Sequence, residues 1–162
     1  MILILDKNIL FYASYYEQLS GEQEKKQPVC RQLIDELRRP SCMYQVAYSQ
    51  EILREYYRVG KPKPSANPVG ESPRAYLNKF IKEIESRVYP ATPDELPEEL
   101  LAYLEQVKFD RDDYKYVQLA VSEKIKLIIT EDSGDFSLIK DYLSRNYGVE
   151  VLTAAEALEK LF

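Results

Sequence analysis

The stretch MILILDKN at residues 1–8 decides the expected fold, because a continuous apolar run ends there at an aspartate. Such a run is typical of a strand that is buried on both faces of a parallel sheet. A second apolar run, KLIIT at 126–130, also ends beside acidic residues. Amphipathic stretches separate the apolar runs. This alternation predicts an α/β fold of three layers, α/β/α, with a doubly wound parallel sheet of four to five strands.

The expected elements follow one another along nearly the whole chain. Strands are expected at 1–6, 43–48, 126–130 and 149–152, and helices at 8–19, 28–39, 50–59, 74–87, 95–107, 110–124, 135–146 and 154–162. Residues 21–27 are interpreted as a polar connection, with Pro28 in the first turn of the next helix. The stretch 60–73 is dense in Pro, Gly and Ser and predicts a loop. Residues 1–162 are therefore expected to form a single domain with an extended loop and helical segment at about 60–97.

The sequence contains no histidine. This excludes Ser-His-Asp and Cys-His catalysis, histidine-ligated zinc and a histidine general base. The two cysteines, Cys30 and Cys42, lie in no CxxC or Cys/His metal pattern, and we expect them to be small buried residues. Any chemistry must therefore use carboxylates, hydroxyls, lysines and a metal ion.

The net charge of −5 argues against broad, sequence-independent binding of nucleic acid, which usually needs a basic face. A site of four or five carboxylates accounts for a charge of that size, and bound divalent cations would invert it locally. No apolar run approaches the roughly 18 residues that span a bilayer, and residues 1–5 carry no basic leader. A cytoplasmic location without membrane association is the expectation.

Acidic residues from distant parts of the sequence are expected at one edge of the sheet. Open α/β sheets bind ligands at the carboxyl ends of their strands, where residues that follow different strands meet. Clustered carboxylates raise each other's pKa and are unfavourable unless a cation fills the site. Oxygen ligands without histidine or cysteine favour Mg²⁺ or Mn²⁺ over zinc. The acids that follow strands or lie early in helices are Asp6, Glu55, Asp110, Asp112, Asp113, Asp132 and Asp135.

Each of these acids also has a structural interpretation. Asp110 and Asp113 have the spacing of a helix N-cap and a favourable acid in the first turn, and Asp132 and Asp135 repeat that spacing. Asp6 can cap the helix that follows it. Taken singly, each acid is more often a cap or a solvated charge than a ligand, and only their gathering at one edge favours a metal site.

Four short motifs, in the same order as in the family, resemble those of PIN-like domains. ILDKN at 4–8 is similar to the opening motif, an aspartate followed two residues later by Asn, Ser or Thr. SQEILRE at 49–55 is similar to the second, in which a serine starts a helix and a glutamate lies six residues on. DRDDYKYVQLA at 110–120 resembles the third, and IITEDSGDF at 128–136 resembles the fourth, T-x-D with a nearby D-F. No single motif is specific, but the ordered set spans nearly the whole chain.

The resemblance implies a set of site residues. The catalytic acids carried over by position are Asp6, Glu55, Asp113 and Asp132; the implied metal ligands are Asp6, Asp113, Asp132 and Asp135; Asn8 and Thr130 are expected to orient ligands. Helical geometry favours Asp113 within its cluster, because it shares a face with Val117 and Ala120, whereas Asp112 points about 100° away. Glu51, one turn earlier, remains the alternative to Glu55.

PIN-like families are mostly Mg²⁺- or Mn²⁺-dependent nucleases, commonly endoribonucleases, and VapC-type toxins are their largest group. The resemblance therefore implies an endoribonuclease that cleaves single-stranded or structured RNA, with an antitoxin or a second copy of the chain among the partners to consider. The segment at about 60–97 is longer than compact toxins carry, which disfavours a toxin. The alternative is a PIN-fold binding or regulatory module without significant nuclease activity.

Basic residues flank the Pro-rich stretch, close in sequence to Glu55. One interpretation is a clamp that follows the phosphates of RNA beside the metal site. The other is a solvated loop. The residues of this candidate RNA-binding group are Arg54, Arg58, Lys61 and Lys63.

Overall fold

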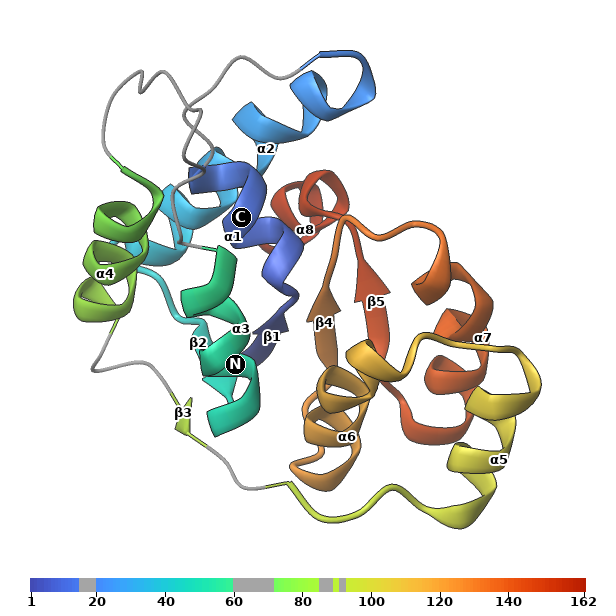
Figure 1. Ribbon diagram of the computed structural model, residues 1–162. Helices are drawn as coiled ribbons and strands as arrows, with labels where there is room; N and C mark the ends of the chain where they lie inside the picture. Colours follow the sequence, from blue (N-terminus) through green and yellow to red (C-terminus); the bar gives the residue numbers. More distant parts are fainter. Residues whose placement is uncertain (15–19, 60–71, 85–88, 91–92) are drawn as a thin grey trace.

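The computed structural model describes residues 1–14, 20–59, 72–84, 89–90 and 93–162 (Figure 1). Their strands form one parallel five-stranded sheet in the order β3-β2-β1-β4-β5. The strands are β1 (Ile2–Leu5), β2 (Gln45–Tyr48), β3 (Tyr89–Pro90), β4 (Leu127–Ile129) and β5 (Glu150–Leu152). The α/β class and the parallel sheet are confirmed.

Helices connect the strands and cover the sheet as the outer layers of an α/β/α fold (Figure 1). They are α1 (Lys7–Ser14), α2 (Glu22–Arg38), α3 (Gln50–Val59), α4 (Pro73–Glu83), α5 (Glu98–Gln106), α6 (Tyr114–Ser122), α7 (Asp135–Tyr147) and α8 (Ala154–Leu161). Helix α2 packs against α1, α4 and α8, while α6 packs on β4 and α7 on β5. Among the described residues, no helix combines the length and apolar character that crossing a membrane requires.

The strand order places a topological switch point between β1 and β4. From β1 the chain builds outwards through β2 to β3, and it then returns to the other side of β1 to form β4 and β5. Parallel pairing sets Leu5 opposite Ile129, and the Asp6 N–H donates to the Ile129 carbonyl at 2.9 Å. Residues that follow β1 and β4 are therefore neighbours in the crevice where such sheets bind ligands.

The two strands at this switch point lie in the centre of the hydrophobic core. Leu3, Ile4 and Leu5 of β1 are fully buried, as are Ile128 and Ile129 of β4. Burial of each such side chain contributes roughly 1.5–3 kcal/mol to folding. The apolar run that predicted a strand is thus explained by helices on both of its faces, and the core holds the residues that follow it in place.

Helix α2 begins earlier than expected. Residues 21–27 were interpreted as a polar connection, but the helix starts at Glu22 and Pro28 lies inside it. The first turns contain Glu, Gln and Lys, which are good helix formers. Lys26 also makes a tertiary contact, because its ammonium donates to the Glu131 carbonyl at 2.9 Å. Polarity here therefore marks an exposed helix rather than a loop.

Two further elements differ from those located in the sequence, although a sheet of five strands agrees with the expected four to five. Strand β3 was not predicted: it has two residues at the sheet edge, where a proline can pair because one side of an edge strand needs no donor. The helix expected at 110–124 is divided into a 3₁₀ turn (Arg111–Asp113) and α6. The tighter turn matters for the site, because Asp113 closes it and is buried.

Candidate metal centre

Asp6 is the innermost acid of the site. It follows β1 directly and is 0% exposed. Its Oδ2 accepts hydrogen bonds from the Thr130 hydroxyl at 2.7 Å and from the Asn8 side-chain amide at 3.1 Å. A fully buried carboxylate needs such partners, since an isolated charge in the interior is strongly unfavourable. Asn8 and Thr130 thus hold the Asp6 carboxylate in one orientation.

Thr130 connects Asp6 to Asp132. While its hydroxyl donates to Asp6, the same oxygen accepts the Asp132 N–H at 2.9 Å. The Asp132 Oδ1 accepts the N–H groups of Gly134 and Asp135 at 3.0 and 3.2 Å. Asp132 therefore caps the turn that leads into α7, so its structural interpretation holds, and its Oδ2 remains suited to act as a ligand.

The start of α6 brings a second group of acids to the same edge. Carboxylate oxygens of Asp110, Asp113 and Asp135, called the trio below, all lie within 4.8 Å of one another. Asp113 is buried, whereas Asp110 is exposed and accepts the Asp112 N–H at 2.9 Å as the cap of the 3₁₀ turn. Asp112 itself is exposed, in agreement with the expected direction of its side chain.

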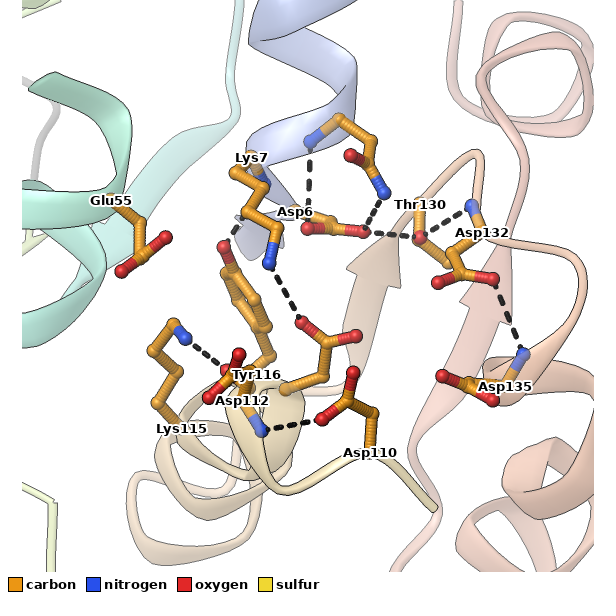
Figure 2. A network of polar contacts seen from close by, with 12 residues as sticks. Asp6, Lys7, Glu55, Asp110, Asp112, Lys115, Tyr116, Thr130, Asp132 and Asp135 are labelled. Atoms are coloured by element: carbon orange, nitrogen blue, oxygen red, sulfur yellow. Dashed lines mark hydrogen bonds and ion pairs between the residues drawn. The ribbon is translucent and has the colours of Figure 1, made fainter. Parts of the chain in front are cut away.

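Together these acids surround the switch point, and Figure 2 labels four of them, Asp6, Asp110, Asp132 and Asp135. Asp110, Asp113 and Asp135 are joined by proximity, Asp135 and Asp132 by the capping hydrogen bond, and Asp132 and Asp6 through Thr130. Asp6 and Asp113 are joined through their mutual electrostatic effect. The name acidic ring is used below for Asp6, Asp110, Asp113, Asp132 and Asp135.

Several carboxyl groups of the acidic ring have a raised pKa, so they lose their protons less readily than free carboxyl groups do. Burial, and then the charge of Asp6, raise the pKa of Asp113 to about 6, although Lys7 acts in the opposite direction. Burial also raises the pKa of Asp6 despite its hydrogen bond from Thr130. The pKa of Asp135 is raised by partial burial and by the charges of Asp132 and Asp110. The protein's own groups therefore do not fully offset the burial of these carboxylates and the repulsion among them.

Lys7 brings a positive charge into the ring. Its ammonium donates to Asp113 Oδ1 at 3.3 Å, and its side chain is 25% exposed. Burial acts to lower the pKa of Lys7, but the surrounding Asp113, Asp6 and Glu55 raise it overall. The lysine is therefore charged at neutral pH.

Glu55 lies on α3, across Lys7 from the ring (Figure 2). Its Oε1 accepts a hydrogen bond from Arg58 at 2.5 Å, and the arginine side chain is 70% exposed. Glu55 acts on the charge of Lys7, whereas Glu51 is exposed in the first turn of α3. Glu55 is thus a neighbour of Lys7 and not a member of the trio.

The structure describes only two of the four basic residues near the Pro-rich stretch. Arg54 and Arg58 are exposed on α3, and Arg58 is paired with Glu55. Lys61 and Lys63 lie outside the described residues. The proposed RNA clamp therefore stays a prediction.

Four residues of the site were not assigned a role from the sequence. Asp110 joins the trio although the family motif points to Asp113, and its i, i+3 spacing was the available signal. Nothing in the sequence pattern indicates Lys7. The buried Tyr56 and Tyr116 support the turn between β1 and α1: the Tyr56 hydroxyl donates to the Leu5 carbonyl at 2.6 Å, and the Tyr116 hydroxyl accepts the Lys7 N–H at 3.0 Å.

The donor set fits a hard divalent cation. The trio offers only carboxylate oxygens, which are the ligands that Mg²⁺ and Mn²⁺ prefer. With metal–oxygen distances of about 2.1 Å, ligand oxygens of an octahedral ion lie roughly 3–4 Å apart. The oxygens of the trio, all within 4.8 Å of one another, approach this spacing. Two of the four predicted ligands, Asp113 and Asp135, belong to the trio.

No model of a known protein family matches the chain, and no curated protein matches it either. The resemblance to PIN-like domains therefore rests on the four ordered motifs alone, and the activity it implies is a proposal.

Proposed function

We propose that the protein is a metal-dependent endoribonuclease that cleaves phosphodiester bonds of single-stranded RNA at the acidic ring, with Mg²⁺ or Mn²⁺ as its cofactor. The observation that carries the proposal is the convergence of three carboxylates within 4.8 Å at the switch point of the sheet. The raised pKa of Asp113, to about 6, supports it, because a bound cation would offset the burial and the repulsion from Asp6 that together raise this value. The order of the four acidic motifs supports the same function.

The residues divide into ligands and groups that orient them. Asp110, Asp113 and Asp135 would hold the ion. Asp6 and Asp132 are the further ligands that the resemblance implies. Asn8 and Thr130 fix the Asp6 carboxylate through hydrogen bonds of 3.1 and 2.7 Å. A bound divalent cation would supply an activated water and stabilise the charge that develops on the phosphate.

RNA would approach from the side of Asp110, the exposed member of the trio. Without a cation, the ring repels a phosphodiester because both are negatively charged. With a cation, the same carboxylates become ligands, and the phosphate meets a positive centre. The proposed activity is therefore strictly metal-dependent.

A second candidate, a binding or regulatory module without nuclease activity, is favoured by one observation. The ammonium of Lys7 already donates to Asp113 Oδ1, so the protein carries a positive charge of its own where a metal ligand is needed. In this alternative, Lys7 would permanently neutralise part of the ring, and the ring would serve the fold rather than a reaction.

Cleavage of labelled single-stranded RNA of mixed sequence separates the two candidates. The nuclease proposal expects cleavage that EDTA abolishes and excess Mn²⁺ restores. Asp6→Asn should reduce the rate by about 100-fold or more, because the fully buried carboxylate of the ring loses its charge. Asp112→Asn is the matched control: it makes the same chemical change at an exposed neighbouring position, and it should leave the rate unchanged. A folded protein that binds Mn²⁺ but cuts no RNA would favour the regulatory module.

A further inference from the structure

Lys7 is placed among carboxylates that belong to three different elements. Its ammonium lies 3.3 Å from Asp113 Oδ1, beside the start of α6. Asp6, at the end of β1, and Glu55, on α3, also act on its charge (Figure 2). Asp113 in turn is a member of the trio whose oxygens are within 4.8 Å of one another. The amine thus contacts the same carboxylate that a divalent cation would need.

We propose that Lys7 is the internal counter-ion of the metal-free acidic ring and sets the affinity of the ring for metal, because its ammonium competes with the divalent cation for Asp113. The inference rests on the proposed function, since it takes the ring to be a metal site. It adds a positioning residue that acts on the metal through Asp113, and it assigns to the ion pair a role other than fold stability alone.

Electrostatics makes the two cations alternatives at this carboxylate. A divalent ion on Asp113 would sit within a few ångströms of an ammonium that also touches Asp113, and two positive charges at that distance repel strongly where water is partly excluded. The ammonium, on its flexible four-carbon stem, is the group that can move. Its side chain is 25% exposed, so a path to solvent exists.

The structure also offers the displaced ammonium another partner. Glu55 faces Lys7 from α3, and its present partner is Arg58, whose side chain is 70% exposed. The backbone of Lys7, in contrast, is held, because its N–H donates to the buried Tyr116 hydroxyl at 3.0 Å. We therefore expect the lysine side chain to turn from Asp113 towards Glu55 on metal binding while the turn that carries Asp6 keeps its geometry.

Calorimetric titration with Mn²⁺ alone tests the proposal. Lys7→Met removes the competing charge, and the Kd for Mn²⁺ should fall about tenfold or more relative to wild type. Lys7→Arg keeps the charge, and its Kd should stay within about threefold of wild type. A residue with a merely structural role behaves differently, because losing it loosens the site and weakens metal binding.

Lys26→Met is a matched control. Lys26 is also a partly buried, ion-paired lysine, with a side chain that is 28% exposed, but its partner is Glu131, which is outside the ring. Loss of this pair should leave the Kd for Mn²⁺ unchanged. Lys7→Gln gives a second route if Lys7→Met does not fold without metal, because the neutral amide can still donate to Asp113. This variant should also bind Mn²⁺ more tightly than wild type.

The outcomes separate this inference from the proposed function. Wild type that binds Mn²⁺ while neither Lys7→Met nor Lys7→Gln binds it more tightly overturns the role of Lys7 and leaves the metal site standing. Absence of Mn²⁺ binding in wild type and in all Lys7 variants overturns the metal site itself. Tighter binding in the two neutral variants, with wild-type affinity in Lys7→Arg and Lys26→Met, supports the competition.

Discussion

The carboxylates of the acidic ring differ from those that stabilise the protein surface. Glu83, at the end of α4, accepts a hydrogen bond from the Arg38 guanidinium, which lowers the pKa of the glutamate. Glu156, in the first turn of α8, accepts the Thr153 N–H at 2.7 Å, and this backbone hydrogen bond lowers its pKa as well. In the ring, burial and like charges raise the pKa of Asp113 to about 6.

This difference separates acids that stabilise the folded protein as anions from acids that do not. A carboxylate with a lowered pKa is more favourable as an anion in the folded chain than in the unfolded one, so it stabilises the protein at neutral pH. A carboxylate with a raised pKa does the opposite. The protein holds the ring at the switch point despite this penalty, and a bound cation, as proposed above, would offset it.

The largest expected effect is on cleavage. Asp113→Asn should reduce metal-dependent RNA cleavage by about 100-fold or more, because a neutral amide replaces the carboxylate at the centre of the trio. Glu83→Gln, the same chemical change in the paired surface group, should leave the rate within about twofold. Initial rates at saturating Mn²⁺ measure both. Equal losses in the two variants would remove the functional distinction between the groups.

The next effect is a dependence of stability on pH. The pKa of Asp113 is about 6 in the folded protein against a usual value of 3.8, so the folded state binds more protons between these pH values. Stability of the metal-free protein should therefore fall as pH rises from about 4 to about 6, with Asp113 contributing about 3 kcal/mol. Urea unfolding at several pH values in EDTA measures this.

Asp113→Asn provides the control for the pH dependence, since an amide does not titrate. Its stability should change less over the same interval than that of wild type. A stability that rises from pH 4 to pH 6 by the same amount in both proteins would contradict the raised pKa of Asp113 and the contrast with the surface acids.

Metal binding should stabilise the folded protein by a similar free energy. An ion that binds only the folded state adds about 2.7 kcal/mol when its concentration is 100 times its Kd. Thermal melts with and without Mn²⁺ should therefore differ in wild type and differ less in Asp135→Asn, which loses one member of the trio. Asp141→Asn, at an exposed position of the same helix α7, should keep the full response.

The smallest expected effect is the change in the free energy of unfolding when the Arg38–Glu83 ion pair at the surface is lost. Glu83→Gln should lower the free energy of unfolding by less than about 1 kcal/mol at pH 7, because ion pairs in contact with water contribute little. The substitution should nevertheless destabilise the protein, since the pKa of Glu83 is lowered. A stabilised Glu83→Gln protein would show that the direction of a pKa shift does not separate the two kinds of acid.

Local signals predicted most of the elements. Helix α3 has the expected bounds, and the Ser49 hydroxyl caps it by accepting the Ile52 N–H at 3.2 Å. Gly148 ends α7 with a φ of 62°, a conformation that glycine adopts without strain. In contrast, β3 forms only because β2, distant in sequence, supplies its hydrogen-bond partners. With two residues, it is too short to contain a pattern that predicts a strand.

For the site, the sequence by itself determined the chemistry: oxygen ligands, no histidine, and acids that follow β1 and β4 at one edge of a parallel sheet. Only the tertiary structure decided which acids meet. Asp110 joins Asp113 and Asp135 because a 3₁₀ turn faces the start of α7, and Lys7 reaches Asp113 across 106 residues of sequence. The reason is physical. Motif and spacing fix the identity of a side chain and its place on one element, whereas its neighbours from other elements depend on how the helices pack around the core.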